Sequence, residues 1–110
     1  MPKPRILNFC VDKTKEKERM NFTNLRYFVR AYEIGSFTMT GKEFYVSQVA
    51  VSQQIKLIEK ELGTELFCRK QNKVVPTKEG EYFYREAKDI LLKFDNAFNT
   101  IKLQEKRKEI

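Results

Sequence analysis

The chain has 110 residues, enough for one small domain with a modest core and too few for a second domain of ordinary size. Its 22 Lys and Arg outnumber its 15 Asp and Glu, and a net charge of +7 attracts polyanions such as nucleic acid. No apolar run approaches the roughly 20 residues that span a bilayer, and no secretory signal is evident. We therefore expect a cytoplasmic protein with no membrane partner.

The composition also argues against an enzyme. The sequence contains no His and no Gly-rich phosphate loop, and neither of its two cysteines has an activating partner nearby. We predict no catalytic residues, no metal site and no cofactor.

Residues 1–19 form the first segment, which contains two prolines and a run of charged residues from 12 to 19. Such a composition does not support a packed core, so we predict a flexible charged extension. It is either a solvated tail, a basic arm that touches DNA, or the product of an upstream start codon assigned in error.

Two helices are predicted at the start of the folded domain, which we place at 20–80. The first is capped by Thr23 and ended by Gly35, because apolar residues between 25 and 32 recur at helical spacing. Ser36 or Thr38 caps a second, shorter helix. Gly41 in its interior costs up to about 1 kcal/mol relative to Ala.

A third helix begins at Ser47 and ends at Gly63. Its apolar stripe predicts a face turned toward the core: Ala50, Val51, Ile55, Ile58 and Leu62. The opposite stripe is mostly polar: Gln48, Val49, Ser52, Gln53 and Lys56.

The polar stripe has the chemistry needed to read base edges in a major groove. Glutamine amides match adenine N6 and N7, Ser52 bonds to many edges, Lys56 reaches a phosphate or guanine, and Val49 packs on a thymine methyl. For an isolated helix, a solvated face is the alternative interpretation.

Two β-prone runs follow, at 66–68 and 74–76, and residues 69–73 between them predict a hairpin with a cationic tip. Arg69, Lys70 and Lys73 then form a wing that meets the DNA backbone or the minor groove. The free N–H groups at the starts of the second and third helices, near Ser36, Thr38 and Ser47, also suit phosphates.

Thr77 caps the last helix, whose linker and dimerisation segment we place at 81–110. Its apolar residues follow a heptad pattern that is wider than one small domain requires. We predict that it pairs two chains as a homodimer. The predicted dimer seam comprises Ala87, Ile90, Leu91, Phe94, Ala97, Phe98 and Ile101.

Several motifs together resemble the N-terminal DNA-binding domain of LysR-type transcriptional regulators over residues 20 to about 101: Asn24-Leu-Arg-Tyr-Phe-Val29, Gly35-Ser-Phe-Thr38, Val46-Ser-Gln48, Ala50-Val-Ser52, Glu61-Leu-Gly63 and Leu66-Phe67. The resemblance implies a mainly α fold: a winged helix-turn-helix with a three-helix core, a two-stranded wing and a long C-terminal dimerisation helix. It also implies that the helix-turn-helix spans 37–56 and that Arg69 is the wing residue that meets DNA.

The chain departs from the family pattern at several places. Thr40-Gly41 replaces two alanines, which should loosen the second helix, while Val49 replaces a proline and Gln53 a common arginine. The family places an effector domain after the linker helix, and this sequence stops at that helix. We therefore expect either an excised or truncated DNA-binding half or a natural protein without an inducer pocket, and in both cases no small-molecule effector pocket in this chain.

Two functions follow as hypotheses. The first is a transcriptional regulator that binds an inverted-repeat site on double-stranded DNA as a dimer. The alternative is a dimerisation module that sequesters full-length relatives in mixed dimers.

Overall fold

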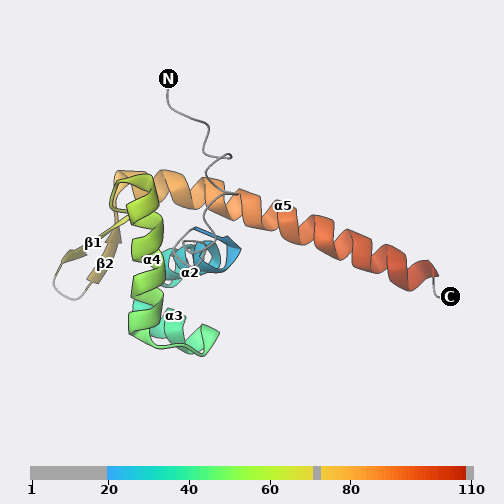
Figure 1. Cartoon of the computed structure of the whole chain (residues 1–110), viewed down its shortest axis with the longest axis horizontal. Helices are drawn as coiled ribbons and strands as arrows, with labels where there is room; N and C mark the ends of the chain where they lie inside the picture. Colours follow the sequence, from blue (N-terminus) through green and yellow to red (C-terminus); the bar gives the residue numbers. More distant parts are fainter. Residues whose placement is uncertain (1–19, 71–72, 109–110) are drawn as a thin grey trace, which may run out of the picture.

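The computed structural model describes residues 20–70 and 73–108 and shows a small helical domain from which one long helix extends (Figure 1). The order of elements is α2 (Phe22–Ile34), α3 (Phe37–Phe44), α4 (Gln48–Leu62), β1 (Phe67–Lys70), β2 (Lys73–Pro76) and α5 (Lys78–Lys108). This is the mainly helical winged helix-turn-helix that the sequence predicted. The predicted extension at 1–19 lies outside the described residues.

The first helix begins earlier than predicted. Asn21, not Thr23, is the N-cap of α2, because the side chains of Asn21 and Asn24 each accept the other's backbone N–H at 2.9 Å. This capping box satisfies two donors that the first turn would otherwise leave open. Gly35 ends the helix with φ 77°, as its position predicted.

Gly41 fits α3 better than its helix propensity suggests. Ser36 caps this helix, and the chain then turns back so closely that a Cβ on Gly41 would lie 2.6 Å from the Val46 carbonyl oxygen. Thr40 beside it is fully buried and donates its hydroxyl to the Ser36 carbonyl at 2.7 Å. The expected loosening of the helix is therefore offset by tight packing at the turn.

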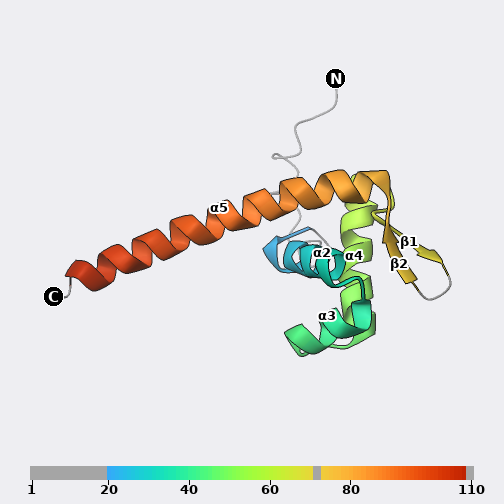
Figure 2. The same ribbon diagram turned by 180° about the vertical axis from the view of Figure 1, so that it is seen from behind.

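The core lies where α2, α4 and the first half of α5 meet, with the hairpin closing one side (Figures 1 and 2). Phe28 is at its centre and contacts the rings of Phe67 and Phe83 at centroid distances of 5.4 and 5.3 Å. The buried apolar side chains are Leu25, Phe28, Val29, Ala31, Phe37, Val51, Ile55, Ile58, Leu66, Phe67, Ala87 and Leu91. Burial on this scale is the main term that holds a domain of this size together.

The two strands pair in antiparallel register, with Phe67 opposite Pro76 and Lys70 opposite Lys73. The predicted placement of the wing cations in a five-residue turn is wrong, because Arg69, Lys70 and Lys73 all lie on the strands. Two further pairs follow Cys68 and Val75 in the ladder, Arg69 with Val74 and Lys70 with Lys73, and the β-branched Val74 suits a strand.

Helix α5 begins at Lys78 and has 31 residues, so it starts directly after the predicted cap Thr77 and three residues before the linker segment placed at 81–110. Thr77 caps it by accepting the Gly80 N–H at 3.0 Å, while its own hydroxyl donates to the Glu65 carbonyl at 2.7 Å. The helix crosses one end of α4 and then continues away from the domain, on the side opposite the hairpin (Figures 1 and 2). At 1.5 Å per residue it is about 46 Å long, so its second half extends past the core.

Candidate nucleic-acid interface

Helix α4 presents two chemically different faces. Val51, Ile55 and Ile58 are completely or almost completely buried against the core. Gln48, Val49, Gln53 and Lys56 are exposed on the other side, and Ser52 is half-buried. The predicted polar stripe is therefore accessible along the helix.

The predicted apolar stripe of α4 is too long. Ala50 is half-buried rather than enclosed, and Leu62 keeps 42% of its surface exposed. Leu62 lies at the end of α4, where it lines a shallow groove with Tyr82 and Phe83 of α5. The packing that anchors α4 is thus concentrated at three residues.

The hydroxyl groups near the helix starts have specific partners within the protein. Ser36 and Ser47 cap α3 and α4 by accepting the N–H groups of Met39 and Ala50 at 3.1 and 3.0 Å. Thr38 instead donates its hydroxyl to the side-chain carbonyl of Gln48 at 3.1 Å, across the helix-turn-helix. Phosphate contacts at these residues remain a prediction, but Thr38 also positions a side chain of α4.

Arg69 connects the wing to the same helix. Its guanidinium group donates a hydrogen bond to the Ser52 hydroxyl and lies 4.9 Å from the centre of the Phe37 ring. A cation over an aromatic face is attracted by the ring quadrupole. Arg69 therefore bridges β1, α3 and α4, a contact that the sequence did not predict.

Tyr45 is a further residue at this surface that the sequence analysis missed. It lies in the turn between α3 and α4, is 96% exposed and has φ 60°, a left-handed conformation that non-glycine residues rarely adopt. Its backbone N–H closes α3 through the carbonyls of Gly41 and Lys42. Helical spacing predicted Tyr45 as part of the second helix, and this is wrong, because α3 ends at Phe44 and Tyr45 lies in the turn with its ring exposed.

A network of charged groups holds α2, α3 and α5 together behind the interface. Arg30 pairs with Glu43 on α3 and Glu33 on its own helix, both at 2.7 Å, and Lys88 on α5 pairs with Glu33 at 2.9 Å. Burial alone would raise the pKa of Glu33, but hydrogen bonds from Tyr84, Lys88 and Arg30 outweigh it and lower the pKa to about 2.

The reciprocal effect of the same contacts raises the pKa of Arg30, chiefly through its hydrogen bonds to Glu43 and Glu33. Arg26 and Asp95 form a second link between α2 and α5, with two N–O distances of 2.8 and 3.2 Å. The hydrogen bond to Arg26 lowers the pKa of Asp95. These pairs join α5 to α2 through polar contacts.

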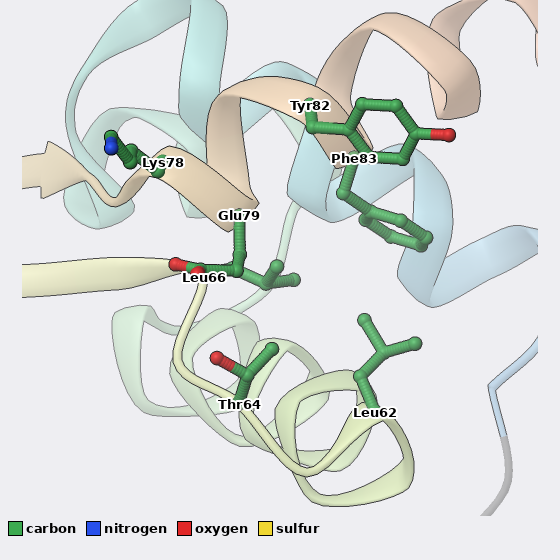
Figure 3. Close-up of a pocket in the computed structure, with 7 residues that line it drawn as sticks. All are labelled: Leu62, Thr64, Leu66, Lys78, Glu79, Tyr82 and Phe83. Carbon is green, nitrogen blue, oxygen red and sulfur yellow. The ribbon is translucent and has the colours of Figure 1, made fainter.

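A shallow groove of about 410 Å³ lies between the end of α4 and the start of α5 (Figure 3). Leu62 and Phe83 point into it from opposite sides, and Leu66 also lines it. Lys78, Glu79 and Tyr82 complete the α5 side. The groove has a mainly apolar lining, which indicates no particular ligand. The expected lack of an effector pocket in this chain stays a prediction.

Two other kinds of site are absent from the part of the chain that the structure describes. No cluster of His, Cys, Asp or Glu there has the arrangement of a metal site. No helix among these residues combines the length and apolar character needed to cross a membrane.

A family model described as bacterial regulatory helix-turn-helix protein, lysR family, matches residues 22–81. The chain belongs to the LysR family. The matched segment runs from α2 through the wing into the first turn of α5, so it covers the whole winged helix-turn-helix. The chain resembles the DNA-binding domains of transcription regulators, which are not enzymes.

Curated LysR-family relatives share the same region. The nitrogen assimilation regulatory protein nac of Escherichia coli (strain K12) is 38% identical over 78 residues, which are 71% of this chain and 26% of that protein. The HTH-type transcriptional regulator BudR of Klebsiella aerogenes is 44% identical over 78 residues, 71% of this chain and 54% of the relative. The similarity therefore spans between a quarter and about half of these relatives.

Solved structures of LysR-family domains bound to DNA are similar in fold. The complex of the BenM DNA-binding domain with catB site 1 DNA has a TM-score of 0.72 and 36% identity, covering 76% of this chain and 92% of that one. The complex of the CbnR DNA-binding domain with DNA has a TM-score of 0.71 and 27% identity, covering 77% and 98%. Both domains are therefore similar to this chain in sequence as well as in fold.

Proposed function

We propose that this chain binds double-stranded DNA at specific sequences, with α4 as the recognition helix, and regulates transcription from those sites. One observation carries the proposal: the buried residues of α4 anchor it to the core while Gln48, Val49, Gln53 and Lys56 remain exposed on its other side. A recognition helix needs both properties to enter a major groove. The BenM and CbnR domains bound to DNA support this assignment by their similarity.

Net charge supports the same partner. The excess of seven positive charges favours association with a phosphate backbone, and the wing places Arg69 beside the recognition helix. Phosphate contacts from the wing would position the domain, while α4 would supply the base contacts. Lys70 and Lys73 on the same two strands are the other proposed backbone contacts.

We further propose a homodimer that is joined through the second half of α5 and binds an inverted repeat. Ile90, Phe94 and Phe98 are about half exposed on this helix, and Ile101 is 60% exposed. A row of exposed apolar side chains is unusual on a monomer and typical of an interface. Ala97 lies on the same exposed segment.

Two members of the predicted seam are corrected by the structure. Ala87 and Leu91 are buried in the chain's own core, at 0% and 6% exposure, so they do not face a partner. The heptad pattern does not distinguish these core residues from the exposed ones. The same apolar repeat continues from the part of α5 that packs on the domain into the part that extends past it. The proposed seam therefore starts at Ile90 and continues through Ile101.

Base reading can be tested by selecting bound duplexes from a random pool at near-physiological salt. We expect a two-fold symmetric motif to be enriched. Gln53→Ala and Ser52→Ala should each weaken binding to that motif by about 1 to 3 kcal/mol, with a smaller effect on random duplexes. Equal loss on both duplexes would rule out base reading by the substituted residue.

Lysine variants provide the control for charge. Lys73→Ala should weaken binding to all duplexes and flatten the dependence on salt, because it removes a proposed phosphate contact. Lys60→Ala removes the same charge from the far end of α4 and should change both much less. Equal effects of the two variants would show that only total charge matters.

Dimerisation is tested by measuring molecular mass over a range of concentrations. Ile101→Asp should shift the chain to monomer, because it places a charge within the proposed apolar seam. Asn99→Asp adds the same charge on the same exposed helix and serves as the control. A wild-type chain that stays monomeric at all concentrations would exclude pairing through α5.

The alternative role, pairing with longer relatives in mixed dimers, would use the same exposed residues of α5. It predicts that wing and α4 substitutions leave the effect on a regulated promoter unchanged, while Ile101→Asp abolishes it. DNA binding predicts that both kinds of substitution abolish it, so a reporter assay separates the two.

A further inference from the structure

Two residues proposed to read bases have their acceptor oxygens engaged within the protein. The Gln48 side-chain carbonyl accepts the Thr38 hydroxyl at 3.1 Å, and the Ser52 hydroxyl oxygen accepts a guanidinium N–H of Arg69. Neither donor lies on α4, since Thr38 belongs to α3 and Arg69 to β1. The orientation of these two side chains is therefore set by the surrounding elements.

The consequence for Gln48 follows from the planarity of its amide. A side-chain amide has one acceptor end and one donor end on the same rigid plane. When Thr38 holds the carbonyl end toward α3, the NH₂ end is the one left to meet a ligand. Gln48 is exposed, so this donor is accessible from the DNA side.

The consequence for Ser52 is electrostatic. Arg69 fills a lone pair of the hydroxyl and places a positive charge beside it, while Phe37 holds the guanidinium at 4.9 Å from its ring centre. A nearby cation repels the partly positive hydrogens of base amino groups and favours partly negative acceptors. The Ser52 hydroxyl is thus prepared to donate its own hydrogen.

We infer that α4 reads DNA as a hydrogen-bond donor surface, with Gln48 and Ser52 matched to the acceptor atoms of the major groove. Those atoms are N7 of both purines, O6 of guanine and O4 of thymine, whereas cytosine N4 and adenine N6 are donors. Thr38 and Arg69 are the positioning residues of this surface. The inference rests on the proposed DNA binding and narrows its chemistry.

The first experiment removes single acceptors from the selected duplex. Each purine is replaced in turn by its 7-deaza analogue, which lacks N7, and each thymine by 5-methyl-2-pyrimidinone, which lacks O4. At the base that Gln48 contacts, the wild-type chain should lose about 5- to 150-fold in affinity. Gln48→Ala should no longer respond to the same replacement.

The opposite replacement tests the alternative orientation of the amide. Adenine is replaced by 2-aminopurine, which keeps N7 but lacks the N6 donor of the major groove. The inference predicts little change at the Gln48-dependent base. It is overturned if that base responds to loss of a donor and not to loss of an acceptor, or if Gln48→Ala weakens all duplexes equally.

The second experiment tests Thr38 as a positioning residue. Thr38→Val removes the hydroxyl with little change in shape, so the Gln48 side chain is no longer held. The ratio of affinities for the natural and the acceptor-deleted duplex should fall by about 2- to 12-fold, the cost of ordering one long side chain. Thr100→Val removes a hydroxyl bonded to a backbone carbonyl on α5 and should leave the ratio unchanged.

Arg69→Lys provides the matching test at Ser52. It retains the positive charge of the wing but loses the planar donor that reaches both Ser52 and Phe37. Discrimination at the Ser52-dependent base, measured as the ratio of affinities for the natural and the acceptor-deleted duplex, should fall. The ratio cancels any loss of backbone contact, because that loss weakens binding to both duplexes equally. Unchanged discrimination in both Thr38→Val and Arg69→Lys would overturn the inference.

The outcomes keep the two proposals distinct. If the random pool yields no enriched sequence, the proposed sequence-specific binding fails and the donor surface fails with it. If a motif is enriched but its Gln48-dependent base tolerates acceptor deletion, DNA binding stands and only the donor surface is refuted.

Discussion

Helix α5 is a single continuous helix whose two halves have different surroundings. In the first half, Ala87 and Leu91 are buried in the core, and Lys88 is paired with Glu33 of α2. In the second half, Phe98, Ile101 and Leu103 are between 51% and 60% exposed. Secondary structure is identical across the two, so it does not explain the difference.

What separates the halves is the presence of a partner surface. The first half has α2 and β2 beside it, so its apolar residues are covered by the same chain. The second half continues past α2 after Asp95, whose ion pair with Arg26 is the last polar link to α2 among the described residues. An apolar repeat therefore indicates that side chains need burial but not which chain covers them.

Alanine substitution of one apolar residue in each half of α5 should give very different losses of stability. Leu91→Ala should lower the free energy of unfolding by about 2 to 5 kcal/mol, because it opens a cavity in the core. Phe98→Ala removes a larger side chain but should change the unfolding of the isolated chain by less than about 0.5 kcal/mol. Thermal or denaturant unfolding at low protein concentration measures both.

Raising the protein concentration sharpens this comparison. If the second half of α5 pairs two chains, the wild-type Tm should rise with concentration, and Phe98→Ala should reduce that rise. Leu91→Ala should leave the slope unchanged while lowering the whole curve. A large effect of Phe98→Ala at the lowest concentration would show that the second half packs on its own domain.

The next effect concerns the point where α5 begins. Gly80 is buried, and a Cβ at this position would overlap the Leu66 carbonyl oxygen, a backbone atom with little room to move. Gly80→Ala should therefore destabilise the domain by about 1 to 3 kcal/mol, although alanine is the better helix former. Urea unfolding measures the change.

Gly63 is the control for this substitution, although for a different reason. Its surroundings leave open space for a Cβ, but its φ of 74° strains any other residue. Gly63→Asn should cost less than Gly63→Ala, because asparagine tolerates the left-handed region better. At Gly80 the order of cost should follow side-chain volume instead, and the opposite pattern would contradict the steric explanation.

The sequence predicted most of the fold because its local signals agree with one another. Ser36, Ser47 and Thr77 cap helices, Gly35 and Gly63 end them, and apolar spacing identifies the buried face of α4. The errors are local. Asn21, and not the predicted Thr23, caps α2, because the side chains of Asn21 and Asn24 bond reciprocally to each other's backbone N–H.

The candidate site was less predictable, because its organising contacts join residues far apart in the sequence. Exposure of Gln48 and Gln53 followed from helical spacing alone. The bonds from Thr38 to Gln48 and from Arg69 to Ser52 depend on how three elements pack, which no local pattern encodes. The burial of Ala87 and Leu91 likewise required knowing where the core ends.

The smallest expected effect concerns the polar link between the first half of α5 and α2. Hydrogen bonds hold the pKa of Glu33 near 2, below the ordinary value of 4.5. The ionised carboxylate of Glu33 therefore stabilises the folded state. This stability is fully present above pH 4.5 and is lost as the pH falls toward 2. Glu33→Gln should cost about 1 kcal/mol at pH 7, since ion pairs this accessible are screened by solvent.

The difference in stability between Glu33→Gln and wild type should shrink below pH 4.5 and disappear near pH 2. Glu61→Gln, at the exposed end of α4, is the control and should differ little from wild type at pH 7. A Glu33→Gln deficit that persists unchanged to pH 2 would mean that its carboxylate charge does not attach α5 to α2.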